Sequence, residues 1–178
     1  IYDHYLSEGA ADRMCAYLKE RWEKPGSRYH VMKEMFACLH KLEVLSADWP
    51  KKVRHYEKVL FGGGRKQYEA LHQYRMPDKI AEQLLSYFIY VYFAGAVYDG
   101  MPYSKVKLAV ISTMLIEDMV CAKAAEKGQL SFEAIADAAH SYAREVEHSD
   151  LNLQRLSIMF RHRKCFHIGR LCGALLEW

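Results

Sequence analysis

The sequence has few residues that break regular structure and no closely spaced cysteines. Its 178 residues include 4 prolines and 10 glycines, which excludes collagen-like chains and long flexible linkers. Its five cysteines form no CxxC pair, so they predict neither a disulfide framework nor a zinc ribbon. We interpret them as free thiols that pack as small hydrophobic side chains. These cysteines are Cys15, Cys38, Cys121, Cys165 and Cys172.

A strong excess of charge of one sign is also missing. The 25 Lys and Arg residues against 22 Asp and Glu residues give a net charge of +3, which is too small to predict nucleic-acid binding. The start of the chain has no basic segment followed by an apolar one, so we predict no signal peptide and a cytoplasmic location. Because the first residue is Ile1 rather than Met, we expect the chain to be processed, trimmed or a fragment of a longer protein, and its length predicts a single domain over residues 1–178.

No alternating run of β-branched residues lies between turn signals, so a sheet is not predicted. Apolar residues instead recur with the spacing of helices, and we expect an all-α, multi-helix orthogonal bundle. The predicted helices cover approximately residues 28–45, 50–61, 80–98, 104–126, 131–147 and 150–160. They are separated by turn residues such as Gly62-Gly63-Gly64 and Gly128.

The two most apolar helices, 80–98 and 104–126, are joined by the tight turn Asp99-Gly100-Met101-Pro102. We expect them to pack as an antiparallel hairpin at the centre of the domain. The apolar stretch 84–97 is shorter than the roughly 20 residues that cross a bilayer. Charged residues at Lys107, Glu117 and Asp118 interrupt the apolar sequence of the second predicted helix. We therefore predict no membrane-spanning segment.

Reactive side chains are densest between Asp137 and Asn152. At about 100° per residue, Arg144, Glu147 and His148 lie on the helix face opposite the apolar one. One interpretation is a solvated charged face. The other is a site, in which His148 exchanges a proton near neutral pH, Glu147 orients it or receives an amine, and Arg144 binds a carboxylate. The spacing of an HExxH metal site is absent, so we predict no metal ligands.

Tyr98 and Asp99 end the first helix of the hairpin. If the segment 142–152 packs nearby, these two residues would line a cleft that they share with it. Neither the run FGGGRK (61–66) nor any other stretch has the glycine spacing of a P-loop or a Rossmann fold after a strand. Nucleotide binding of those two kinds is therefore not predicted.

Several stretches resemble a known family. YVYFAGAVYDG (90–100), SKVKLAVIST (104–113) and AHSYAREVEHSDLNLQRL (139–156) are similar to the C-terminal helical part of the flagellin lysine-N-methylase family. RYHVMKEMF (28–36) and LEVLSADWP (42–50) are similar to the part that precedes it. The most specific portion is REVEHSDLNL (144–153), and the resemblance covers about 28–156.

The resemblance implies a cytoplasmic bacterial protein that transfers methyl groups from S-adenosylmethionine to lysines of a protein such as flagellin. Under this hypothesis Glu147 and His148 are catalytic, with one of them the proton acceptor, and Tyr98, Asp99 and Arg144 bind substrate or cofactor. The family's cysteine-rich N-terminal motif, taken to hold an iron–sulfur cluster, is absent from these residues. A cluster is expected only if a preceding segment supplies it, and we expect the 178 residues alone to be inactive.

Two other interpretations of the sequence stay open. The chain is then either a non-catalytic helical interaction or scaffold domain that binds a protein or self-associates, or a helical regulator that binds a small molecule. Neither nucleic acid nor membrane is an expected partner, and the pattern predicts no oligomeric state.

Overall fold

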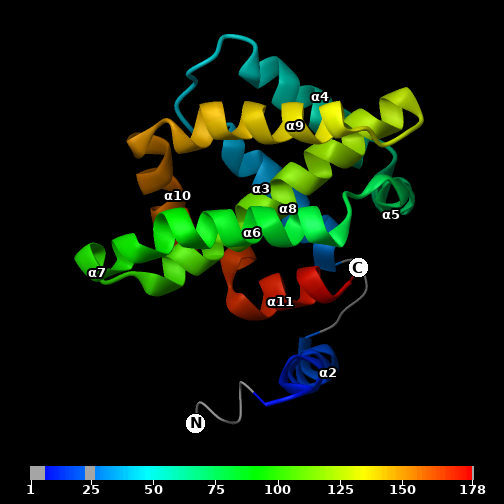
Figure 1. Ribbon diagram of the computed structural model, residues 1–178. Helices are drawn as coiled ribbons and strands as arrows, with labels where there is room; N and C mark the ends of the chain where they lie inside the picture. The colour runs from blue at the N-terminus through cyan, green and yellow to red at the C-terminus, as the bar shows by residue number, and fades with distance from the viewer. Residues whose placement is uncertain (1–6, 23–26, 178) are drawn as a thin grey trace.

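The computed structural model describes residues 7–22 and 27–177, and the regular elements in these ranges are all helical (Figure 1). The predicted all-α, multi-helix fold is confirmed. The α-helices are α2 (Ala10–Trp22), α3 (Ser27–Leu39), α4 (Trp49–Phe61), α5 (Gly64–Leu71), α6 (Asp78–Tyr92), α7 (Ala96–Asp99), α8 (Pro102–Lys127), α9 (Phe132–Tyr142), α10 (Asp150–His162) and α11 (Ile168–Leu176). Short 3₁₀ turns are η1 (His72–Tyr74), η2 (Phe93–Gly95) and η4 (Lys164–Phe166), and η3 (Ala143–Glu147) is a π-helical turn.

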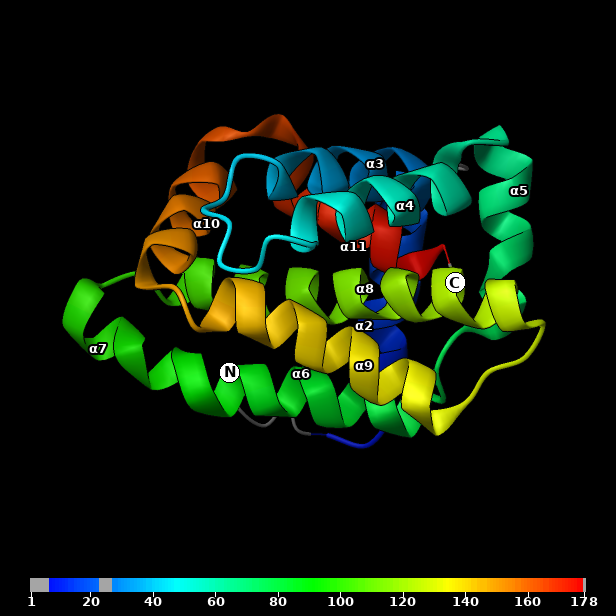
Figure 2. The same cartoon turned by 90° about the horizontal axis from the view of Figure 1, so that it is seen from above.

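Helix α8 is the centre of the domain. Residues 111–122 of this helix are all buried, on every side. Helices α3, α4, α6, α9 and α10 pack against it, and Figure 2 shows it passing through the middle of the bundle. A helix that is apolar around its whole circumference must be covered on all sides, and α8 meets that requirement with neighbours from both halves of the chain.

Local sequence signals set the ends of the central helices. Gly100 and Gly128 adopt left-handed φ angles of 65° and 70° after α7 and α8, a conformation that glycine adopts without steric cost. Ser131 caps α9, because its side chain accepts a hydrogen bond from the backbone N–H of Ala134 at 3.2 Å. The turns at Gly100 and Gly128 were expected from the sequence.

The predicted hairpin is present, but its two arms differ in burial. Helix α6 packs along α8, with Phe88 buried between α6 and the rest of the bundle. The Phe88 ring meets the ring of Tyr142 of α9 edge to face at 6.2 Å. The opposite side of α6 faces outward, and Tyr90 is 88% exposed. Figure 2 shows α6 along the outer edge of the bundle.

The continuous helical run Asp78–Asp99 is longer than the apolar stretch 84–97 that the sequence analysis considered. Its most apolar 18-residue window has a mean hydropathy of 1.3, and 6% of that window is buried. By length and composition alone this run is the one segment among the described residues that is able to cross a membrane, and a single such helix is a weak indication.

The one-sided packing of α6 predicts opposite results for two aromatic residues. Phe88→Ala should lower the free energy of unfolding by about 3–5 kcal/mol, since it opens a cavity beside Tyr142. Tyr90→Ala should change it by less than about 0.5 kcal/mol, because the ring lies in solvent. Urea denaturation of both variants tests this, and equal losses would contradict the orientation of α6.

Candidate functional site

The segment that the sequence analysis singled out is not a regular α-helix. Its helix α9 ends at Tyr142 and continues as the π turn η3, in which the His148 N–H bonds to the Ala143 carbonyl at 3.2 Å. A π turn holds one more residue than an α turn, so the projection at 100° per residue fails beyond it. As a result the neighbouring residues Glu145 and Val146 are both buried.

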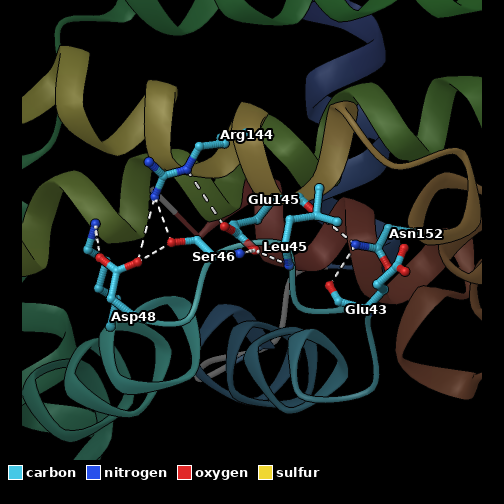
Figure 3. A network of polar contacts seen from close by, with 8 residues as sticks. Glu43, Leu45, Ser46, Asp48, Arg144, Glu145 and Asn152 are labelled. Carbon is cyan, nitrogen blue, oxygen red and sulfur yellow. Dashed lines mark hydrogen bonds and ion pairs between the residues drawn. The ribbon is translucent and has the colours of Figure 1, made fainter.

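Glu145 and Asn152 fasten the loop that follows α3 (Figure 3). The Glu145 carboxylate accepts the backbone N–H groups of Leu45 at 3.0 Å and Ser46 at 3.2 Å. The Asn152 side chain accepts the Glu43 N–H at 2.6 Å and donates to the carbonyls of Glu43 at 3.0 Å and Glu145 at 2.7 Å. These contacts require an irregular backbone at 43–46. For this reason α3 ends at Leu39, earlier than the predicted end near residue 45.

Arg144 belongs to the same loop contact. Its guanidinium donates to the Ser46 hydroxyl at 3.1 Å and lies 3.8 Å from the Asp48 carboxylate and 3.7 Å from that of Glu145 (Figure 3). The role of Arg144 in binding substrate or cofactor stays a prediction.

Glu147 and His148 lie on either side of the end of the π turn. The Glu147 carboxylate accepts hydrogen bonds from the hydroxyls of Tyr87 at 3.0 Å and Tyr92 at 2.9 Å, both from α6. Burial and the Glu147 charge both raise the pKa of Tyr92. The segment thus lies against the apolar hairpin, as expected. His148 is exposed, and the proton-accepting roles of both residues stay predictions.

Tyr98 and Asp99 differ in their surroundings. Tyr98 is 94% exposed. Asp99 pairs with Lys105 at 2.8 Å, accepts the Met101 N–H at 2.9 Å and lines a cleft of about 440 Å³. This cleft lies between the hairpin and α10, where Asp150 also lines it. The structure therefore places Asp99, but not Tyr98, in a cleft shared with the 142–152 segment.

A second polar cluster, which the sequence analysis did not predict, is buried against α8. Arg28 of α3 is 1% exposed, and its guanidinium lies 3.3 Å from the Glu117 carboxylate and 3.2 Å from that of Asp118. The Tyr68 hydroxyl of α5 donates to Asp118 at 2.9 Å. The Glu177 carboxylate accepts the Arg28 backbone N–H at 2.6 Å. Four separate segments of the chain therefore meet at this cluster.

The cluster holds two buried carboxylates for one buried guanidinium. Burial raises the pKa of Glu117 to about 7, although the Arg28 charge opposes the rise. Burial likewise raises the pKa of Asp118 to about 6, against the opposing effects of Arg28 and the Tyr68 hydrogen bond. A carboxyl group that titrates near neutral pH and borders a cleft is suited to proton exchange and to binding a cation.

Glu117 borders an open cleft of about 280 Å³ between α6 and α8, which we call the Glu117 cleft. Its walls combine aliphatic groups with charged ones. The aliphatic groups are Ala81, Leu85, Val110 and Met114, and the charged ones are Arg28, Arg75, Asp78, Glu82 and Glu117. Arg75 pairs with Asp78 at 3.5 Å. Asp78 and Glu82 are exposed, whereas Glu117 is buried at the inner end.

One sequence signal of this cluster was available. Glu117 and Asp118 are adjacent acids inside the otherwise apolar run LAVISTMLIEDMVCAKAA (108–125), and the sequence analysis used them only as an argument against a membrane span. Buried charges need a partner. That partner, Arg28, is 89 residues from Glu117 along the chain, and no local pattern identifies it.

The comparisons with known proteins gave one match. The family model described as FliB lysine N-methylase C-terminal domain matches residues 1–174. No curated protein and no solved structure matches the chain. Within residues 7–22 and 27–177, no group of three or more His, Cys, Asp or Glu side chains is placed to hold a metal ion, so this part of the chain offers no ligand set for an iron–sulfur cluster.

Asn152 should be important for stability. Asn152→Ala leaves the partly buried N–H and carbonyl of Glu43 and the buried carbonyl of Glu145 without their partner, which we expect to lower the free energy of unfolding by about 2–4 kcal/mol. Gln154→Ala, on the exposed side of the same helix, should change it by less than about 0.5 kcal/mol. Thermal or urea denaturation distinguishes them, and a neutral Asn152→Ala would show that the loop contact contributes little.

Glu117 should make stability depend on pH. Its pKa is raised from 4.5 to about 7 in the folded state. The folded protein therefore holds this proton more tightly than the unfolded chain, and the stabilisation is complete below about pH 4.5 and lost as the pH rises to 7. We expect Glu117→Gln, which cannot ionise, to gain stability relative to wild type between about pH 5 and pH 8. If the difference in the free energy of unfolding between Glu117→Gln and wild type stays constant across this range, the pKa of Glu117 is not raised.

Proposed function

The chain belongs to the FliB lysine N-methylase C-terminal domain family, and from this premise we propose that the Glu117 cleft receives the lysine side chain of a protein substrate. The observation that carries the proposal is the position of Glu117, a buried carboxyl group with a pKa of about 7 at the inner end of a cleft with aliphatic walls. S-adenosylmethionine as the methyl donor and flagellin as the substrate are proposed from the family alone.

The cleft is chemically complementary to lysine. Leu85, Val110 and Met114 provide apolar contacts for the four methylene groups of the side chain. Glu117 then meets the ammonium group, and a charge-assisted hydrogen bond in a partly dry site is stronger than one in water. Glu82 at the outer rim adds negative charge where the cation enters, whereas the charge of Asp78 is paired with that of Arg75.

The same carboxylate suits the proton transfer that methylation requires. An amine attacks a methyl group only when it is neutral, and desolvation in the cleft lowers the pKa of the lysine ammonium. Glu117 accepts the proton that the nitrogen loses, while the new N–C bond forms and the C–S bond of the donor breaks to leave a thioether. Arg28 acts as a positioning residue, because its guanidinium pairs with Glu117, which borders the cleft, and with Asp118.

Binding of a small lysine compound tests the proposal on the 178-residue chain. We expect Nα-acetyl-lysine methylamide to bind in calorimetric titrations and the norleucine analogue, which lacks the ammonium, not to bind. Glu117→Gln should weaken binding about tenfold, which corresponds to the loss of one charge-assisted hydrogen bond. The control Glu133→Gln, at an exposed acid of α9, should leave the affinity unchanged.

The pH dependence provides the second part of that test. Only ionised Glu117 attracts the ammonium, so the affinity should fall about tenfold for each pH unit below about 7 and level off above it. The Glu117→Gln variant should lack this dependence. Equal binding of the lysine and norleucine compounds, or a pH profile that the variant shares, would reject the Glu117 cleft as the lysine site.

A further inference from the structure

The outward side of the helical run Asp78–Asp99 bears a set of exposed large apolar side chains. Ile89 and Tyr90 of α6, Phe93 of η2 and Val97 of α7, which together we call the α6 stripe, are all exposed, Tyr90 by 88% and Val97 by 84%. Solvent-exposed apolar groups that cluster in this way mark interaction surfaces more often than isolated ones do. Aromatic residues such as Tyr90 also contribute heavily to protein interfaces.

The α6 stripe is continuous with the rim of the Glu117 cleft. Glu82 lines that cleft and also lines an open groove of about 430 Å³ on the outside of α6, which reaches Ser86 and Tyr90. Within the helical run Asp78–Asp99, residue 86 follows 82 by four, residues 89 and 90 follow 86 by three and four, and residue 93 follows these two by four and three. These residues therefore lie along one side of the run. A molecule that leaves the cleft past Glu82 therefore meets this groove first and the α6 stripe next.

We propose that the α6 stripe and its groove bind the polypeptide segment that flanks the substrate lysine. This inference rests on the proposed function, because a lysine side chain is short and its main chain must lie at the mouth of the cleft. The neighbouring residues of the substrate then extend over α6. The occupant is a polypeptide with aliphatic side chains beside its lysine. The groove offers the Tyr90 ring and methylene groups to such side chains, and Lys79 and Glu82 carry opposite charges.

A labelled peptide tests this arrangement on the full 178-residue chain. The probe carries one lysine between leucine and alanine residues, and its binding is followed by fluorescence anisotropy. We expect it to bind at least tenfold more tightly than Nα-acetyl-lysine methylamide. The double variant Tyr90→Ser with Val97→Ser should abolish that advantage and leave the affinity for the small compound unchanged. Phe132→Ser, at a 74% exposed aromatic residue of α9, is the matched control and should change neither affinity.

The outcomes separate this inference from the proposed function. If the double variant binds the peptide as tightly as wild type while Glu117→Gln loses both probes, the α6 stripe is not the docking surface and the lysine cleft stands. If wild type binds neither probe, both proposals fall. If wild type is a dimer and the double variant is a monomer, the stripe binds a second copy of the chain. If wild type floats with phosphatidylglycerol vesicles and the double variant does not, the stripe binds a lipid surface. Either result overturns the inference.

Discussion

One arginine and two carboxylates in the interior fix where α3 meets α8. Arg28 faces both Glu117 and Asp118, and these acids belong to the helix around which the other helices pack. Leaving one of these charges without its partner inside the protein would cost several kcal/mol, so α3 and α8 must meet at this point. Burial at this contact raises the pKa of Glu117, and the neighbouring Asp118 charge adds to the rise. Architecture and proton chemistry therefore arise from one contact.

The segment 142–152 combines two structural tasks that a helical wheel does not reveal. Glu145 and Asn152 fix the loop after α3, and Glu147 accepts hydrogen bonds from two tyrosines of α6. The π turn makes both possible, since its additional residue turns Glu145 toward the loop and leaves Glu147 directed at α6. The run that carries the family resemblance most specifically thus contains the residues that join three parts of the bundle.

The parts of the fold that depend on local sequence could be predicted, and those that depend on distant partners could not. Apolar spacing and turn residues such as Gly100 and Gly128 placed the two long helices and their ends. The burial difference between α6 and α8 was not predictable, because both stretches are similarly apolar. The pairing of Arg28 with Glu117 spans 89 residues, and the loop at Glu43 meets Asn152 across 109. The proposed site depends on such distant pairs. The sequence pattern indicated instead the dense cluster of reactive side chains at 137–152, which does not contain the Glu117 cleft.

The neutral-pH titration of Glu117 has a thermodynamic consequence for any cation that enters its cleft. Near pH 7 about half of the molecules carry a proton on this carboxyl group, and an ammonium that binds the ionised form displaces that proton into the solvent. Occupancy of the cleft would then be linked to proton release, and the heat of binding would vary with the ionisation enthalpy of the buffer. The domain would exchange one positive charge for another and keep the net charge of its interior nearly constant.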